Sequence, residues 1–447
     1  MIKTIVLVAI FGLYVDGTPD DRFYCYSLDM LHPQIATFGT TTPYDRIGNH
    51  IINPLVSKCK PARFWYQGRH GSRYPSLTDQ DNLLSPTDTI DNDIYKNFLT
   101  KKTTLCFTDA LNIKAWTMNP NFTLPTPGPL TETGWDELNK LAVRLQRAFP
   151  TLLPKTYSPQ HYYFRRSPIS RTLQSAQAFA SGLFGGNVYE SVNYDGGFLP
   201  DNYLIPFYTC PIWMDNISKN TSQFDAFAQT SHYLQMIKQA SEKLGFSGNR
   251  QLSANMVDKL ITHCKYEQLY NHIRPSPFCA AFSYENHQVN EYYRDLYFYY
   301  MFGYGDASNK KVFESMSCYL IQAMLQFLQS NNQSDQKAKI WFGHDATLIL
   351  TLSALDLYGD AVQLTASNFE QQSSRNFKTS YLAPMGGNLA VIRFDCDGGD
   401  NEILFLHNEK PLQIPGCQPN GVCKQSYVLQ KYSRYLSVNC DVGFCKK

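Results

Sequence analysis

The sequence lacks a large excess of charge of either sign and has only one long apolar run. Lysine and arginine total 40 and aspartate and glutamate total 38, so the net charge is +2. This balance argues against a broad basic face that follows a nucleic-acid backbone, and any anion must be bound by a local cluster of cations. After residue 17 no stretch approaches the roughly 20 apolar residues of a transmembrane helix. We expect no nucleic-acid partner and no membrane span.

The one apolar run lies at the start of the chain. Lys3 precedes the apolar segment Ile5–Leu13, and small or polar residues follow up to Gly17. This order of a positive, an apolar and a small-residue region is typical of a secretory signal peptide. We predict that residues 1–17 are a signal peptide and that the mature protein is secreted. The lumen of the endoplasmic reticulum is the alternative, although the chain ends without a retention signal.

Paired CxxC motifs, which zinc sites often use, are also missing. All twelve cysteines follow the predicted signal peptide, and in an oxidising compartment an even number favours disulfides over thiol chemistry or zinc. Three pairs are close enough in sequence for local loops: Cys264 with Cys279, Cys417 with Cys423, and Cys440 with Cys445. The rest of the connectivity stays open. Candidate N-glycosylation sites agree with export, at Asn121, Asn216, Asn220 and Asn332.

Short strand-like segments, each followed by a helical pattern, recur along the chain. Strands are predicted over 62–68, 161–164 and 338–343, and helices over 135–149, 170–184 and 346–357. Such alternation predicts an α/β fold, with a central, mostly parallel sheet and helices on both faces. Segments 388–395 and 402–407 are expected to add an antiparallel hairpin.

The pattern changes to polar helices rich in aromatic residues between about residues 188 and 334, for example over 222–244 and 291–301. Little strand signal is present there. We therefore predict a helical insertion domain over 188–334. The α/β domain is expected to comprise residues 18–187 and 335–447.

The densest cluster of reactive side chains is Arg69–Pro75 (RHGSRYP), directly after the first predicted strand. Arg69 and Arg73 offer planar, permanently charged donors that suit a phosphate monoester, and Gly71 allows close approach of the backbone. Cations on both sides favour neutral His70, which leaves a ring nitrogen free to attack phosphorus. A surface turn or a non-catalytic anion site is the alternative interpretation.

Two further clusters follow the other predicted strands. Arg166 stands at the end of the second predicted strand and Arg171 at the start of the 170–184 helix, where amide groups and the helix dipole favour an anion. A solvated basic turn would have the same composition. His344 and Asp345 follow the strand over 338–343. Asp345 could be an ordinary N-cap worth about 1 kcal/mol, or a general acid for the leaving oxygen, with His344 as a donor to phosphate.

In order and context, these three motifs resemble the branch-two histidine phosphatases, which include histidine acid phosphatases, phytases and multiple inositol polyphosphate phosphatases. The resemblance runs from about Tyr24 to Cys445. Segments 38–44, 299–305 and 408–411 resemble the last group in particular. The resemblance implies a metal-free phosphohistidine mechanism with no cofactor. It also implies an α/β domain that carries a helical insertion.

The resemblance also implies a role for each residue. His70 would attack phosphorus and Asp345 would donate the proton, while the phosphate would be held by Arg69, Arg73, Arg171 and His344. The chain reads His-Asp at 344–345, as acid phosphatases and fungal phytases do, where the inositol polyphosphate group often reads His-Ala-Glu.

The expected substrate is a small phosphate ester, and inositol polyphosphates such as phytate and its lower esters are the first candidates. Arg166 and Lys378 are candidate contacts for distal phosphates. A broad secreted acid phosphatase, or a binder that holds phosphate ligands without turnover, is the alternative. Scattered histidines such as His161, His263 and His272 lack the spacing of a metal site, so no metal is expected.

Overall fold

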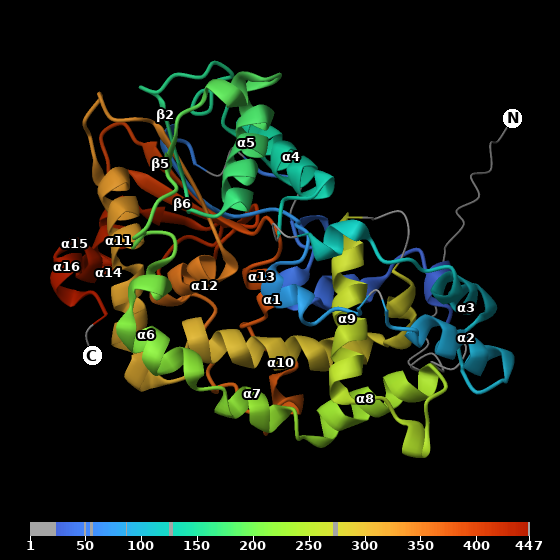
Figure 1. Cartoon of the computed structure of the whole chain (residues 1–447). Helices are drawn as coiled ribbons and strands as arrows, with labels where there is room; N and C mark the ends of the chain where they lie inside the picture. The colour runs from blue at the N-terminus through green and yellow to red at the C-terminus, as the bar shows by residue number, and fades with distance from the viewer. Residues whose placement is uncertain are drawn as a thin grey trace, which may run out of the picture.

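The computed structural model describes residues 24–48, 51–53, 57–85, 87–124, 128–270 and 276–445. The predicted signal peptide lies outside these residues. The described chain forms one eight-stranded mixed sheet in the order β3-β2-β4-β1-β5-β6-β7, and β8 also pairs with β6. Helices cover both faces of this sheet, and a larger group of helices lies to one side of it (Figure 1). The predicted α/β class is confirmed.

The sheet has a parallel half and an antiparallel half. Its strands are β1 (Lys60–Arg69), β2 (Tyr162–Arg166), β3 (Tyr194–Gly196), β4 (Ala338–Gly343), β5 (Asn388–Asp395), β6 (Glu402–His407), β7 (Lys410–Pro411) and β8 (Val422–Lys424). β1, β2, β3 and β4 pair in parallel. The predicted hairpin, β5 with β6, adds to β1 in antiparallel orientation, which makes the sheet mixed.

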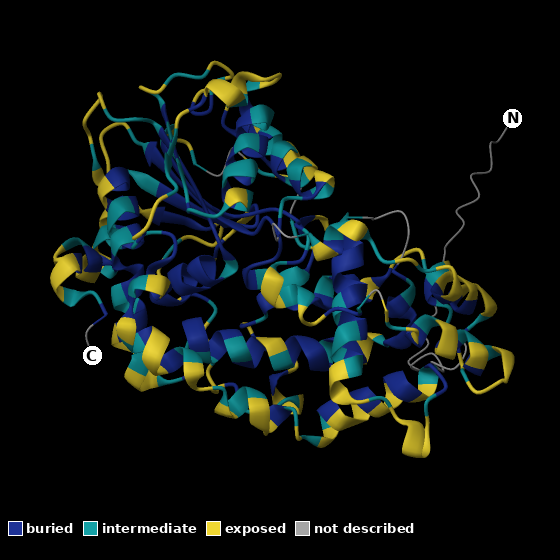
Figure 2. Cartoon of the chain, in the orientation of Figure 1, coloured by how far each residue is buried: buried dark blue, intermediate teal, exposed yellow. Residues whose placement is uncertain are grey.

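Alternating side chains of the central strands bury both faces of the sheet. Trp65 and Trp341 belong to one apolar cluster, whereas Tyr66 and Phe342 belong to another. The first cluster includes residues of α11 (Lys310–Gln329) and α12 (Asp345–Ala354), and the second includes residues of α4 (Glu132–Ala148) and α5 (Ser170–Phe184). Since successive strand side chains point to opposite faces, the central strands are buried on both sides, as the dark blue strands in Figure 2 illustrate.

An N-terminal cap and an apolar stripe along one face account for helix α4. The Thr131 side chain accepts a hydrogen bond from Gly134 N at 3.0 Å and so caps the first turn. Leu138, Leu141 and Leu145, spaced by three and four residues, are fully buried against α5 and the sheet.

The helices between β3 and β4 are α6 (Pro211–Asp215), α7 (Ser222–Phe227), α8 (Ser231–Lys243), α9 (Ala254–Tyr270), α10 (Tyr284–Phe302) and α11. The single helix expected over 222–244 is wrong. It is divided because Thr230 adopts an extended conformation and caps α8 through Tyr233 N. The chain also enters this region through β3, which extends the sheet beside β2.

The remaining helices are short. They are α1 (Leu77–Gln80), α2 (Ile90–Leu99), α3 (Phe107–Lys114), α13 (Thr379–Leu382), α14 (Gln425–Lys431), α15 (Ser433–Leu436) and α16 (Cys440–Gly443). No helix among the described residues has the length and apolar character that a membrane crossing requires.

All twelve cysteines form disulfides. The local loops Cys264–Cys279 and Cys417–Cys423 are confirmed. The disulfide expected between Cys440 and Cys445 is wrong, because α16 packs on α11 and places Cys440 against Cys318. Cys445 instead reaches Cys210. The other bonds are Cys25–Cys106 and Cys59–Cys396.

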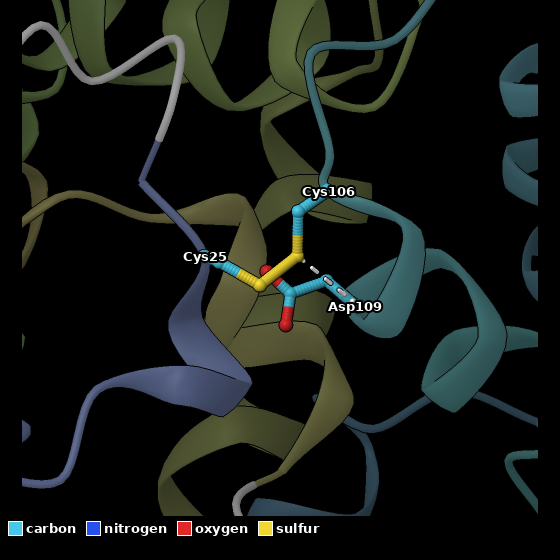
Figure 3. Close-up of side chains that lie close together, drawn as sticks. All are labelled: Cys25, Cys106 and Asp109. Atoms are coloured by element: carbon cyan, nitrogen blue, oxygen red, sulfur yellow. Dashed lines mark hydrogen bonds between the residues drawn. A yellow bond between two sulfur atoms is a disulfide. The ribbon is translucent and has the colours of Figure 1, made fainter.

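The Cys25–Cys106 disulfide ties the first described residues to α3 (Figure 3). Asp109 lies beside it, and its carboxylate accepts hydrogen bonds from Tyr26 N and Ser27 N, each at 2.8 Å. Ligand-type side chains also gather around Cys59–Cys396. In both groups the sulfurs are bonded to each other, so they offer no thiolate to a metal ion.

Candidate active site

The parallel half of the sheet brings the three predicted motifs to one edge. Arg69 pairs with Gly343 at the ends of β1 and β4, and Arg166 pairs with Phe342 at the end of β2. The carboxyl ends of parallel strands meet at the same edge, which is where α/β proteins bind ligands. The loop after β1, Ser167 after β2 and His344 after β4 therefore face one site.

His70 is held in position by its own backbone and by its ring. Its N–H donates to Gly343 O at 3.2 Å and its carbonyl accepts from Gly386 N at 2.9 Å. Nδ1 lies 3.0 Å from Gly71 O, and since a carbonyl only accepts, Nδ1 carries the hydrogen and Nε2 keeps its lone pair. Burial, together with Arg171, Arg69 and Arg73, lowers the pKa of His70 well below its usual value.

Arg69 is 1% exposed and stays charged because acceptors surround it. Its guanidinium donates to the carbonyl oxygens of Thr40 and of Ala383, the latter at 2.7 Å, and pairs with Asp345 at 3.0 Å. Arg73 pairs with Asp79 at 2.9 Å and lies over the ring of Tyr266. Both guanidinium groups are thus oriented by protein groups before any ligand arrives.

Arg171 and His344 complete a ring of donors around His70. Arg171 lies in the first turn of α5, and burial with its neighbours Arg73 and Arg69 lowers its pKa to about 10. The His344 ring centre lies 5.6 Å from that of His70, and its Nε2 is 2.9 Å from Ser167 Oγ. Burial and Arg171 lower the pKa of His344 to about 3, so its ring is neutral.

Asp345 is the first residue of α12 and is partly exposed. Its Oδ1 accepts from Ala346 N at 2.8 Å and its Oδ2 faces Arg69. Burial by itself raises the pKa of Asp345, but Arg69 and the Ala346 amide outweigh it, and the pKa is lowered. Because Arg69 is the main opposing charge, a phosphate bound to Arg69 would raise the pKa of Asp345 again.

A cavity of about 150 Å³ lies beside this cluster, and helices α9 and α10 supply its other wall. His70, Arg171 and His344 are not among the residues that line it. Arg69, Arg73 and Asp345 line one side, and Lys265, Asn290 and Arg294 line the other. Lys265 is 6% exposed, and its ammonium donates a hydrogen bond to Asn290 Oδ1. Burial and then Arg294 lower its pKa to about 7.

Sequence reasoning missed Lys265 and Arg294. One signal was available for Lys265, which stands four residues from each of the buried residues Ile261 and Leu269 on α9. A lysine in a buried stripe is unusual unless it is paired or functional. Arg294 is exposed and its sequence context carries no such signal.

The two candidates for distal phosphates lie elsewhere. Arg166 donates to Ser167 O at 3.3 Å, and its guanidinium lies against Gly197. Lys378 directly precedes α13, in the electrostatic surroundings of Glu291. Neither residue lines the cavity, and their role stays a prediction.

Comparison with known proteins defines the class. The profile of the histidine phosphatase superfamily (branch 2) matches residues 68–408, which include all three motifs. The chain therefore belongs to this family and is a phosphoric monoester hydrolase.

Relatives within the family cover nearly the whole chain. Multiple inositol polyphosphate phosphatase 1 of Drosophila melanogaster is 32% identical over 434 residues, which cover 95% of this chain and 90% of the relative. Among solved structures, the phytase from D. castellii superposes with a TM-score of 0.71 at 18% identity, covering 90% of this chain and 86% of the phytase.

A second solved relative was crystallised with an anionic ligand. The multiple inositol polyphosphate phosphatase of Bifidobacterium longum, in complex with inositol hexasulfate, superposes with a TM-score of 0.63 at 14% identity, covering 88% of this chain and 97% of that protein. At these identities the two structural matches establish the shared fold.

Proposed function

We propose that this protein is a secreted phosphatase of inositol polyphosphates, with His70 as the nucleophile and Asp345 as the general acid. The observation that carries the proposal is the pairing of a phosphate-sized cluster of donors with a second group of cations across the cavity, Lys265 and Arg294. A monophosphate needs only the first group. A substrate with several phosphates would use both.

In the first step, Nε2 of His70 attacks phosphorus while the bond from phosphorus to the ester oxygen breaks. Because Nδ1–H donates to Gly71 O, Nε2 is the attacking atom. The lowered pKa of His70 keeps Nε2 unprotonated. Arg69, Arg73 and Arg171 hold the equatorial oxygens, with His344 as a further donor. Asp345 gives its proton to the leaving oxygen, so that the product departs as an alcohol.

In the second step, water attacks the phosphohistidine and the phosphorus–nitrogen bond breaks. Asp345, now a carboxylate, takes a proton from that water. Inorganic phosphate leaves, and His70 returns to its neutral form. The position of Asp345 at the cavity, partly exposed, supports both roles.

Lys265 and Arg294 favour polyanionic substrates because each can pair with a phosphate beyond the one being cleaved. Asp258 lines the same cavity and offsets part of this charge. Asp79 is already paired with Arg73. The two cations thus leave the wall attractive to anions.

Secretion is supported by the bonding of all twelve cysteines and by the candidate glycosylation sites. Asn216, Asn220 and Asn332 are exposed and Asn121 is partly exposed, so each of these side chains has room for an N-linked glycan.

The test compares phosphate release from inositol hexakisphosphate and from a simple aryl phosphate, with and without a chelator. We expect a higher kcat/KM for the inositol substrate and no effect of the chelator. Equal kcat/KM for both substrates would favour the broad acid phosphatase. Release of less than one equivalent of phosphate per protein would favour a binding protein.

A further inference from the structure

Ser72 lies between His70 and Arg73 in the loop after β1. Helix α4, or the residue that caps it, bonds to every polar group of the Ser72 backbone and side chain. Its N–H and its hydroxyl donate to Glu137 Oε2 and Oε1, each at 2.9 Å. Its carbonyl accepts from the N–H of Thr131 at 2.9 Å and from the hydroxyl of Thr131 at 3.0 Å. Ser72 is fully buried, so water cannot replace these partners.

The loop and the helix also touch through their backbones. A Cβ atom on Gly134 would lie 2.0 Å from Ser72 O, and one on Gly71 would lie 2.5 Å from Gly134 O. Such contact leaves no room for a side chain between them. The position of α4 therefore sets the position of the loop that carries His70 and Arg73.

We infer that Glu137 is a positioning residue for the phosphatase reaction, which holds the 70–73 loop so that Nε2 of His70 meets phosphorus in line. Glu137 makes two bonds to Ser72 and accepts a third, at 3.3 Å, from Tyr44 N. It does not reach the cavity in which the substrate would bind. Its effect on the reaction passes through Ser72.

The remaining side of Glu137 faces a separate cavity of about 190 Å³ behind the loop. Charged groups around it are Asp45 from the segment before β1, and Asp136, Lys140 and Arg144 from α4 itself. Lys140 pairs with Asp136, and Arg144 with Glu409. Among the carboxylates of this set, Glu137 is the one that bonds to Ser72.

The experiment uses the full-length enzyme and three variants: Glu137→Ala, Glu137→Gln and, as a control, Asp136→Ala. Alanine removes the acceptors of Ser72. Glutamine keeps both contacts with Ser72, because its carbonyl accepts from Ser72 N and its amide donates to Ser72 Oγ, and it loses only the longer bond from Tyr44 N, which falls on Oε1. Asp136 is the neighbouring acid on the same helix and has no bond to the loop.

We expect Glu137→Ala to lower kcat about 10- to 100-fold with KM changed less than about 3-fold, because an error of about 1 Å in the nucleophile costs this much. Glu137→Gln should regain most of kcat, and Asp136→Ala should match the wild type. Thermal unfolding gives the folded fraction of each variant, and kcat is expressed per folded molecule.

The inference is overturned if kcat per folded molecule is unchanged in Glu137→Ala, or if Glu137→Gln is as slow as Glu137→Ala. If Glu137→Ala does not fold, Ser72→Ala is measured in its place, and we expect a smaller fall in kcat. Adding Glu137→Gln to Ser72→Ala should lower kcat no further. An additive double variant would overturn it. Failure of the phosphatase assignment itself would instead appear as inactive wild-type protein.

Discussion

The two walls of the cavity are built in different ways. The phosphate side comes from the end of β1 and the residues that directly follow β1 and β4, and its charged groups are fixed by acceptors, as Arg69 is by Thr40, Ala383 and Asp345. The opposite side comes from the middle of α9 and α10, and Arg294 there is exposed. We infer that the first wall determines the chemistry and that the second determines which phosphate ester binds.

The difference lies in how freely each wall can change. Residues of the phosphate side share backbone contacts with the central strands, so a shift in one displaces the others. Lys265 and Arg294 belong to α9 and α10, outside the sheet, and can be replaced with less effect on the sheet. The predictions below test whether chemistry and selection separate in this way.

The largest effect is expected at His70, the proposed nucleophile. His70→Ala should lower kcat by at least about 10⁴-fold on every phosphate ester, since the covalent route is lost. Reactions with ³²P-labelled substrate, quenched in alkali because the phosphorus–nitrogen bond is acid-labile, should yield a labelled protein for the wild type and none for the variant. A labelled His70→Ala protein would place the nucleophile elsewhere.

A smaller and substrate-dependent effect is expected at Asp345, the proposed general acid. Asp345→Asn should lower kcat for inositol hexakisphosphate roughly 10²- to 10⁴-fold. The loss should be much smaller for 4-nitrophenyl phosphate, because nitrophenolate leaves without a proton. Steady-state kinetics on the two esters provide the comparison, and equal losses on both would argue against a proton donor.

The opposite wall should affect binding and leave the chemistry intact. Lys265→Met should raise KM for inositol hexakisphosphate roughly 10- to 100-fold, the value of about 1.5–3 kcal/mol for a charge-assisted hydrogen bond. Its kcat on 4-nitrophenyl phosphate should hardly change. Lys259→Met on the same helix, outside the cavity, is the matched control. A fall in kcat on both esters would remove the distinction between the walls.

The pH dependence of KM should also show that Lys265 takes part in substrate binding. The pKa of Lys265 is lowered to about 7 by burial and Arg294, so the side chain is charged below that pH and loses its charge above it. KM for inositol hexakisphosphate should therefore rise as pH increases past about 7. Lys265→Arg should suppress this rise because a guanidinium stays charged. Parallel KM profiles for the two proteins would exclude Lys265 as the source.

The smallest effect is expected from the cations outside the cavity. Lys378→Ala and Arg166→Ala should each raise KM for inositol hexakisphosphate less than Lys265→Met does, because neither lines the cavity. Steady-state measurement of KM for inositol hexakisphosphate in each variant provides the test. A larger effect of Lys378→Ala would mean that the substrate extends toward α13.

Strands and amphipathic helices were predictable where local patterns and tertiary packing agree. The predicted spans for β4, α5, β5 and β6 match the structure residue by residue, because apolar periodicity, glycine stops and turn residues point to the same ends. The division of α7 from α8 was not predicted, since it rests on the extended backbone of Thr230 and on the cap that this residue supplies to α8. The partners of Cys440 and Cys445 depend on how α16 and α6 pack, which sequence spacing does not record.

The sequence by itself determined the phosphate side of the site, because each motif directly follows a strand and parallel strand ends must meet at one edge. Only the tertiary structure decided the other wall. Lys265 and Arg294 lie about 190 to 220 residues beyond the Arg69 loop along the chain, and no local rule states which face of α9 or α10 turns toward it. The same holds for Glu137, whose bonds to Ser72 exist only because Gly134 lets α4 approach the loop at backbone distance. Long-range packing, rather than local propensity, places these three side chains.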